Sequence, residues 1–355
     1  MTIRVLIVDD SALMRALLQH RLERESDIAI VGTAADAAEA RQQIKALDPD
    51  VVTLDIEMPG MDGLSFLEKI MALRPTPVIL VSGATEAGAS ATARGLKLGA
   101  VGCVAKSQLR AASHGGDESG LVELVREAAK VRRDRPPRST LPAARPPARS
   151  MPAPPATLPR VIVIGASTGG VEALHTLLAD FPEDCPPTLI VQHINACFAE
   201  AITQSLDRAV RPRVMLAQSD MPLAPGTVLL APGNDRHLQV AGAGSHFLRC
   251  VLREGDPVSG HRPSVDRLFA SLAATLGAER GHEALGILLT GMGQDGAQGM
   301  AQLASIGART IAQNQASCVV FGMPRAAIEL GAASDVLPLD RIAAAVFPLA
   351  EACAS

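Results

Sequence analysis

The chain has 355 residues, 48% of them hydrophobic, which is too long for one ordinary core and predicts two domains. Its formal net charge of −4 and its lack of Trp and Tyr exclude a basic, base-stacking surface, so we expect no nucleic-acid partner. Its apolar runs are far shorter than the roughly 20 residues of a spanning helix, which predicts no direct membrane insertion. Its N-terminus has no signal-peptide pattern, which predicts a cytoplasmic protein.

Short apolar runs alternate with longer amphipathic stretches along both halves, which is typical of βα units. Runs of nearly continuous Val, Ile and Leu predict strands buried on both faces, hence mainly parallel sheets and an α/β fold class. The strands expected in the N-terminal half are Ile3–Val8, Ile28–Val31, Val51–Leu54, Val78–Val81 and Ala100–Ala105. Those expected in the C-terminal half include Val161–Ile164, Thr188–Val191, Val228–Ala231, Leu285–Leu289 and Thr310–Ala312.

Residues 132–159 separate the two halves and are rich in Pro, Arg and Ala. Such a segment buries too little apolar surface to offset its ordering entropy, so it predicts an extended linker between domains at residues 1–131 and 160–355. We expect this segment to act only as a spacer, and a basic docking segment is the alternative. None of the six cysteines forms a C-x-x-C pair, which predicts reduced thiols rather than disulfides or a zinc site.

Five polar residues follow expected strands of the N-terminal half: Asp9 and Asp10, Asp55, Ser82 and Lys106. Ligands of open α/β sheets bind beyond the carboxyl ends of the strands, so we expect these side chains at one edge. Crowded carboxylates repel one another, and Mg²⁺ with oxygen ligands relieves this. Lys106 and Ser82 can hold phosphoryl oxygens, and Asp55 is then the nucleophile that accepts phosphate. Any one of these residues alone is more often a turn residue, but five in phase with strand ends predict a site.

Residues 1–131 resemble a response-regulator receiver domain, on the segments V-L-I-V-D-D-S and V-T-L-D-I-E-M-P-G-M-D-G and on the strand before Lys106. The resemblance implies a five-stranded parallel (βα)₅ fold with Asp55 as phosphoacceptor and a sensor histidine kinase as phosphodonor. It implies Mg²⁺ held by the carboxylates of Asp9, Asp10 and Asp55, with the carbonyl of Glu57 completing the metal shell.

The chain departs from the receiver pattern at two positions. Cys103 stands where receivers usually carry an aromatic residue, and Ser107 stands where they often carry Pro after a cis bond. A cis bond before a residue other than proline costs about 3 kcal/mol, so we expect none at Ser107. We expect phosphorylation to survive both departures and the transmission of the switch to be what they affect.

The first strand expected in the C-terminal half runs into G-A-S-T-G-G, residues 165–170, before an amphipathic stretch. A glycine-rich turn between strand and helix serves either as a phosphate cradle or as the position of a nucleophile beside oxyanion donors. The spacing is not G-x-G-x-x-G and no G-K-[ST] follows. The next strand ends in Gln192-His193 rather than in an acidic residue, which favours the nucleophile.

The end of the strand at Leu285–Leu289 leads to Asp295, so Ser167, His193 and Asp295 are expected at one sheet edge. A histidine can take the proton of a serine, and a carboxylate on its far nitrogen fixes the tautomer. Alone, Ser167 could be a helix N-cap, His193 a core histidine and Asp295 an Asx turn. Four further residues compete for the last two roles: His237, His261, Asp220 and Asp235.

Residues 160–348 resemble the catalytic domain of the chemotaxis protein-glutamate methylesterase. The segments are I-G-A-S-T-G-G, V-Q-H-I, L-A-P-G-N-D-R-H-L, H-R-P-S-V-D-R-L-F, L-T-G-M-G-Q-D-G-A and V-F-G-M-P-R-A-A-I. The resemblance implies a Ser167, His193 and Asp295 triad, Thr168 as support and the backbone N–H of Met292 as oxyanion donor. It implies phosphorylation-activated hydrolysis of glutamate methyl esters on chemoreceptors, with no cofactor in the hydrolase. It leaves open whether receptor glutamines are also deamidated.

Other interpretations remain at this level. The segment His261–Asp266 resembles a family loop near the active site, or it is structural, with Arg262 pairing with Asp266 and Pro263 stiffening the turn. A response-regulator transcription factor would need a small basic helical domain, which the C-terminal half is not. A non-catalytic scaffold of the same fold is a further alternative, as is a methylesterase paralogue of a chemosensory system that does not steer motility.

Overall fold

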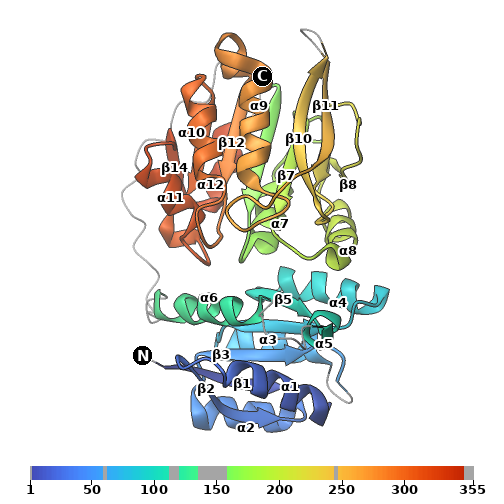
Figure 1. Cartoon of the computed structure of the whole chain (residues 1–355), viewed down its shortest axis with the longest axis vertical. Helices are drawn as coiled ribbons and strands as arrows, with labels where there is room; N and C mark the ends of the chain where they lie inside the picture. Colours follow the sequence, from blue (N-terminus) through green and yellow to red (C-terminus); the bar gives the residue numbers. More distant parts are fainter. Residues whose placement is uncertain (1, 59–61, 112–119, 135–157, 244–246, 348–355) are drawn as a thin grey trace, which may run out of the picture. The chain divides into compact units, whose positions relative to one another are not determined.

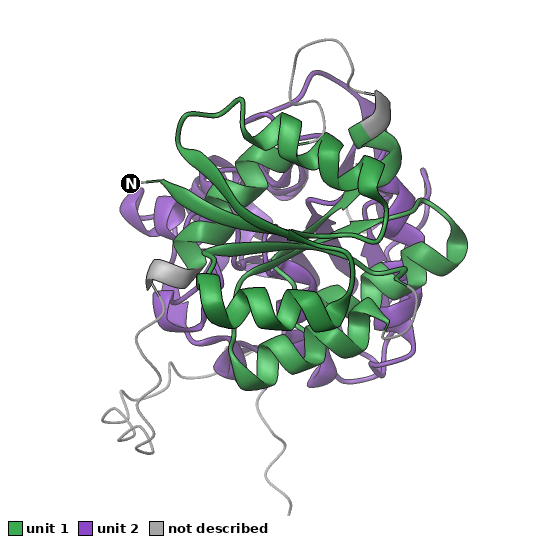
Figure 2. Ribbon diagram, turned by 90° about the horizontal axis from the view of Figure 1, so that it is seen from below, with its two compact units in different colours: residues 1–140 green, residues 141–355 purple. Residues whose placement is uncertain are grey.

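The computed structural model describes residues 2–58, 62–111, 120–134, 158–243 and 247–347 (Figure 1). The chain divides into two compact units, residues 1–140 and 141–355, called here the N-terminal and C-terminal units (Figure 2). Most of the expected linker at residues 132–159 lies outside the described residues, as does the chain after residue 347. None of the described helices is long and apolar enough to cross a membrane.

The N-terminal unit contains a five-stranded sheet in the order β2-β1-β3-β4-β5, with all neighbours parallel. Its strands are β1 (Ile3–Val8), β2 (Ile28–Ala34), β3 (Val51–Asp55), β4 (Val78–Ser82) and β5 (Gly102–Ala105). Its helices are α1 (Ala12–Leu22), α2 (Ala37–Leu47), α3 (Gly63–Leu73), α4 (Glu86–Lys97), α5 (Lys106–Ala111) and α6 (Leu121–Asp134). Every strand expected in this half is present.

The helices α1 to α4 begin where side chains accept hydrogen bonds from free backbone N–H groups. Ser11 caps α1, Asp36 caps α2, Asp62 caps α3 and Thr85 caps α4. Helices cover both faces of the sheet (Figure 2), and α1 and α6 share one apolar core with β1 and β4. The order of the strands reverses between β1 and β3, so the ends of these two strands open a crevice at which ligands can bind.

The C-terminal unit contains a seven-stranded parallel sheet in the order β14-β13-β12-β6-β7-β9-β8. Its strands are β6 (Val161–Ala166), β7 (Thr188–Gln192), β8 (Arg213–Leu216), β9 (Thr227–Leu230), β12 (Ala284–Leu288), β13 (Arg309–Gln313) and β14 (Asp335–Leu337). Its helices are α7 (Gly170–Ala179), α8 (Ala196–Asp207), α9 (Val265–Arg280), α10 (Ala297–Ser305), α11 (Met323–Glu329) and α12 (Leu339–Val346), with 3₁₀ turns at Gly281–Glu283 and Gln315–Ser317.

An antiparallel pair, β10 (Arg236–Ala243) and β11 (Phe247–Glu254), stands apart from the parallel sheet. The sequence patterns did not predict this pair, nor the short edge strands β8 and β14. Leu238 and Cys250 are fully buried and join the same core as Phe269 and Leu272 of α9. The pair therefore extends the core around α9, the helix whose N-terminus enters the site described below.

The order of strands in the C-terminal unit places three loops at one edge. From the central strand β6 the chain passes to β7 on one side and later returns to β12 on the other. The residues that follow β12, β6 and β7 therefore meet at the carboxyl edge, at the topological switch point of the sheet.

Candidate functional site

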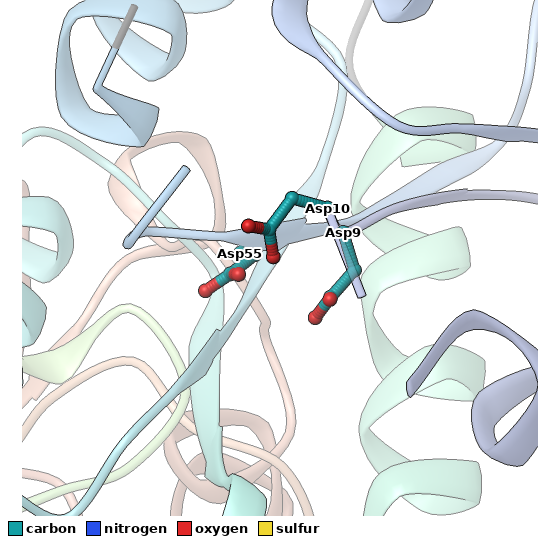
Figure 3. A group of neighbouring side chains, drawn as sticks. All are labelled: Asp9, Asp10 and Asp55. Carbon is teal, nitrogen blue, oxygen red and sulfur yellow. The ribbon is translucent and has the colours of Figure 1, made fainter. Parts of the chain in front are cut away.

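The crevice of the N-terminal unit holds a cluster of three carboxylates. One oxygen from each of Asp9, Asp10 and Asp55 lies within 4.8 Å of the others. Figure 3 shows the three side chains gathered where β1 and β3 end. Asp9 and Asp55 are fully buried, whereas Asp10 is exposed.

Lys106 is the cation at this cluster. Its Nζ lies 2.7 Å from Asp55 Oδ2 and 3.3 Å from Asp9 Oδ2. Burial raises the pKa of Asp55, and although the bond from Lys106 lowers it, the charge of Asp9 raises it again. Burial likewise raises the pKa of Asp9 more than Lys106 lowers it. The single charge of Lys106 thus does not balance the negative charge of the three carboxylates. A Mg²⁺ ion with these oxygens as ligands would supply the remaining positive charge.

The other residues expected at this site lie around the cluster. The backbone N–H of Glu57 donates to Asp55 Oδ1 at 3.1 Å, and the buried hydroxyl of Ser82 donates to the carbonyl of Gly88 at 3.2 Å. Among the described residues the only cis peptide bond is Arg262–Pro263, so the bond before Ser107 is trans, as expected. Lys106 is both the first residue of α5 and the cation of the site.

The second candidate site begins at the turn after β6. Ser167 donates its backbone N–H to the carbonyl of Thr290 at 3.0 Å, which ties this turn to the loop after β12. The N-cap of α7 is Gly169, whose φ of 74° favours glycine, so the interpretation of Ser167 as an N-cap is wrong. The side chain of Ser167 is partly exposed at the start of α7.

Gln192 fixes the turn of Ser167 to the turn of His193. Its amide Nε2 donates to the Ser167 carbonyl at 2.9 Å and to the His193 carbonyl at 3.0 Å. The backbone N–H of His193 in turn donates to Ala166 at 3.0 Å. Because of these bonds the serine and the histidine are held on adjacent strand ends.

His193 meets a buried carboxylate. Its Nε2 lies 2.9 Å from Asp295 Oδ2, and the exposed fractions of the two side chains are 9% and 0%. Its other ring nitrogen, Nδ1, is buried and has no hydrogen-bond partner among the described residues. With Nε2 donating to the carboxylate, Nδ1 is a free acceptor on the same edge as Ser167, as a general base requires.

Asp295 is held by the N-terminus of α9. Its oxygens accept from Ser264 Oγ at 2.7 Å, Val265 N at 2.7 Å and Asp266 N at 3.0 Å. Burial alone would raise the pKa of Asp295, but the bonds from His193, Ser264 and the Asp266 backbone outweigh it and lower the pKa. The carboxylate is therefore ionised and oriented before any substrate arrives.

The competing histidines and carboxylates take other positions. His237 is buried and hydrogen-bonds backbone groups of Asp256 and Ser264. His261 stacks on the ring of His193, with centroids 3.8 Å apart and planes 12° apart. Asp220 pairs with Arg249 at the surface, and Asp235 is exposed.

The loop after β12 approaches Ser167 closely. A Cβ built on Gly291 would lie 2.7 Å from Ser167 Cβ, so only glycine allows this approach. The next residue, Met292, has a backbone N–H without an acceptor among the described residues. Thr168 is buried, and its carbonyl accepts from Thr290 Oγ1 at 3.0 Å. A free donor beside a serine is the arrangement that an oxyanion needs.

Comparison with known proteins decides the family. The CheB methylesterase family model matches residues 162–346, and the response regulator receiver domain model matches residues 5–112. A protein of Caulobacter vibrioides named protein-glutamate methylesterase/protein-glutamine glutaminase 1 is 48% identical over 99% of this chain and 98% of its own length. The chain belongs to the CheB methylesterase family. The expected family and a hydrolase of that family as the enzyme class are thereby confirmed.

Further relatives agree with this assignment. A protein of the same name from Rhizobium johnstonii is 46% identical over 96% of this chain and 94% of its own length. The solved catalytic domain of Thermotoga maritima CheB methylesterase aligns with a TM-score of 0.50 at 31% identity, covering 54% of this chain and 98% of that chain. The expected α/β class with a receiver and a mainly parallel second domain is confirmed, and a transcription factor with a basic helical domain is excluded.

The structure adds residues to this site that the sequence did not single out, and it corrects one interpretation. Ser264 and Gln192 were not predicted to support the triad. Arg262 does not pair with Asp266: it donates to the Gly255 carbonyl at 3.0 Å, while Asp266 Oδ1 accepts from Gly299 N at 2.7 Å. Burial, together with the nearby charge of Asp295, raises the pKa of Asp266 to about 6, although the Gly299 N–H lowers it.

Proposed function

We propose that the C-terminal unit hydrolyses glutamate methyl esters on chemoreceptors and that phosphorylation of Asp55 by a sensor histidine kinase activates it. The observation that supports the esterase most directly is the ring of His193, with Asp295 on one nitrogen and a free acceptor on the other. The names of the relatives give the substrate class.

The proposed reaction uses the side chains in this order. His193 Nδ1 takes the proton of Ser167 Oγ as that oxygen attacks the ester carbonyl. The backbone N–H of Met292 holds the developing oxyanion, Thr168 supports the turn, and Asp295 stabilises the imidazolium. The proton then passes from His193 to the leaving methoxide, which departs as methanol. Water, deprotonated by the same ring, releases the acyl group from Ser167 and leaves a receptor glutamate.

A second substrate follows from the same chemistry. An amide carbonyl in place of the ester releases ammonia in place of methanol, and the relatives are also named protein-glutamine glutaminases. Purified chain incubated with receptor membranes that carry methylated glutamates and unmodified glutamines separates the two activities, because methanol and ammonia are measured independently. Absence of methanol release would remove the esterase proposal, and absence of both products would favour a non-catalytic scaffold of the same fold.

The receiver domain implies phosphorylation, typically with Mg²⁺. In the proposed site the carboxylates of Asp9, Asp10 and Asp55 and the carbonyl of Glu57 would hold Mg²⁺, which would neutralise charge on the phosphoryl oxygens. Asp55 is the nucleophile that becomes the acyl phosphate. Lys106 and Ser82 hold the phosphoryl oxygens, which requires Lys106 to exchange its carboxylate partners for the phosphoryl group. The hydrolase needs no cofactor in this proposal.

Asp10→Asn should weaken Mg²⁺ binding by about tenfold or more, because it removes one of three charges from the cation site. Asp10 is the suitable position since Lys106 pairs only with the other two carboxylates, so the substitution leaves both ion pairs in place. Titration calorimetry of the full chain measures the change. The exposed Asp184→Asn, in the other unit, is the control and should bind Mg²⁺ like the wild type.

A small-molecule phosphodonor with Mg²⁺ should raise methanol release by the wild type about tenfold, within the range usual for coupling between sites. Asp55→Asn should show no response, because no acyl phosphate can form. Intact-mass measurement reports the phosphate and methanol assays report the rate. Phosphate on Asp55 without a rise in rate would contradict activation and point to Cys103 and Ser107 as the positions where the switch has diverged.

We place the receiver at residues 1–131, the linker at 132–159 and the catalytic domain at 160–355. The protein is proposed to be cytoplasmic, where receptor signalling helices and kinases are accessible. We expect reduced cysteines in that compartment. A role in a chemosensory system that does not steer motility uses the same chemistry, and a motility assay of a deletion strain separates the two.

A further inference from the structure

A second imidazole lies against the proposed catalytic base. The rings of His261 and His193 are stacked, with centroids 3.8 Å apart and an angle of 12° between their planes. His261 is neither the nucleophile nor the carboxylate partner of His193, so the proposed reaction gives this residue no role. Two rings so close and so nearly parallel restrict one another, because neither can rotate about its Cβ–Cγ bond without a clash.

A tight turn presents His261 to this position. Val258 and His261 exchange two backbone hydrogen bonds of 3.0 and 2.9 Å. Between them Ser259 and Gly260 have φ of 53° and 80°, as in the type I′ turns that close two-residue hairpins. The ring is thus carried on the stem of a closed hairpin rather than on an open loop.

Hydrogen bonds join the residues on both sides of the hairpin, Asp256 and Ser264, to one buried residue, His237. Nε2 of His237 lies 3.0 Å from the carbonyl of Asp256, and its Nδ1 lies 3.2 Å from the backbone N of Ser264. Arg262 adds a bond of 3.0 Å to the carbonyl of Gly255. Ser264 also donates to Asp295, so one framework holds the carboxylate and the stacked ring around His193.

The environment keeps His261 uncharged at neutral pH. Burial and, after it, the positive charge of His193 lower the pKa of His261 to about 4, although the charge of Asp295 raises it in part. Among the described residues, His193 and Asp295 are the groups on other elements whose charge acts on this ring. A neutral aromatic face next to a ring that gains a proton stabilises the cation, and the effect grows when water is excluded.

We propose that His261 is a positioning residue for the esterase: its neutral ring fixes the plane of His193, so that Nδ1 points toward Ser167, and stabilises the imidazolium as it forms. This inference rests on the proposed function of the triad. It does not require His261 to touch the substrate or to transfer a proton.

Three substitutions separate this role from a packing role. His261→Ala removes the ring and should lower kcat for methanol release about tenfold with little change in KM. His261→Phe keeps a flat neutral ring and should restore kcat to within about threefold of wild type. His261→Arg stacks a permanent cation on the base and should lower kcat at least another tenfold below the Ala variant. The exposed His282→Ala is the matched control and should leave kcat unchanged.

A spectroscopic measurement keeps the inference independent of activity. In ¹⁵N-histidine spectra of the full chain, the signal that His261→Phe removes should remain that of a neutral ring at about pH 5. Protonation of that signal near the ordinary histidine value would overturn the proposal, as would equal kcat for the Ala, Phe and Arg variants. Loss of activity in the Phe variant equal to that in the Ala variant also counts against it. Wild-type activity in Ser167→Ala would instead remove the proposed function, while the spectra still report on the stacked ring.

Discussion

Ser167→Ala should lower methanol release from methylated receptor membranes by at least about 1,000-fold. The substitution removes the atom proposed to attack the ester and leaves nothing for His193 to deprotonate. It keeps the backbone bonds that hold the turn, from Ser167 N to Thr290 and from Gln192 Nε2 to the Ser167 carbonyl. The free energy of unfolding should therefore change by less than about 0.5 kcal/mol. Methanol release and denaturant unfolding, measured on the same preparation, separate the loss of chemistry from a loss of fold.

The C-terminal unit offers a second serine beside a histidine as the matched control. Ser205 Oγ lies 3.2 Å from His175 Nε2, on the neighbouring helices α7 and α8. Ser205→Ala should release methanol at the wild-type rate. An active-site serine probe should label the wild type and the Ser205 variant but not the Ser167 variant. Labelling that survives in Ser167→Ala would show that another serine is the nucleophile and would contradict the proposed triad.

The positions of both sites could be predicted because their residues directly follow strands. Continuous Val and Ile runs are strong strand signals, and parallel strands bring their carboxyl ends to one edge. Asp55 ends β3 and His193 follows β7, so knowledge of the strands was enough to place them. The choice of Ser167 over a phosphate cradle also rested on local spacing, which the sequence contains in full.

The residues that support the triad could not be predicted in this way. Ser264 and Asp295 are separated by a helix and a strand, and they meet only because the N-terminus of α9 packs against the loop after β12. Likewise, the sequence favoured His193 because it follows a strand, but it left His237 and His261 as competitors. What each ring contacts is a property of the tertiary structure: His193 meets a carboxylate, His237 meets backbone groups, and His261 stacks on His193.

The antiparallel pair β10 and β11 illustrates a second limit. Its strands carry polar and charged residues on the outward face, with Leu238 and Val240 of β10 and Leu248 and Cys250 of β11 buried. Two or three inward residues per strand are a weak signal beside the runs of the parallel sheet. The pair nevertheless contributes to the site, since it packs on α9 and carries His237, which fastens the loop of His261.

Asp295→Asn should lower kcat about 10⁴-fold, which is close to the effect of removing the nucleophile. An amide cannot stabilise the imidazolium, and it offers one acceptor oxygen where the carboxylate has two. Those two oxygens accept from His193, Ser264 and two backbone N–H groups of α9. At least one buried donor therefore loses its partner, and the free energy of unfolding should fall by about 1–3 kcal/mol. Methanol release and urea unfolding of both proteins measure the two effects.

The pH dependence of the stability difference tests the charge itself. The folded protein lowers the pKa of Asp295 below its ordinary 3.8, so the carboxylate contributes stability that is present above that value and is lost as pH falls through the folded pKa. The difference in the free energy of unfolding between wild type and Asp295→Asn should be constant above about pH 5 and should become smaller in more acidic solution. Asp220→Asn is the control, because Asp220 is an exposed aspartate with φ of 67° that Asn tolerates, and its activity should be unchanged. A difference that grows on acidification would mean that Asp295 is protonated in the folded protein, and that His193 is held without an ion pair.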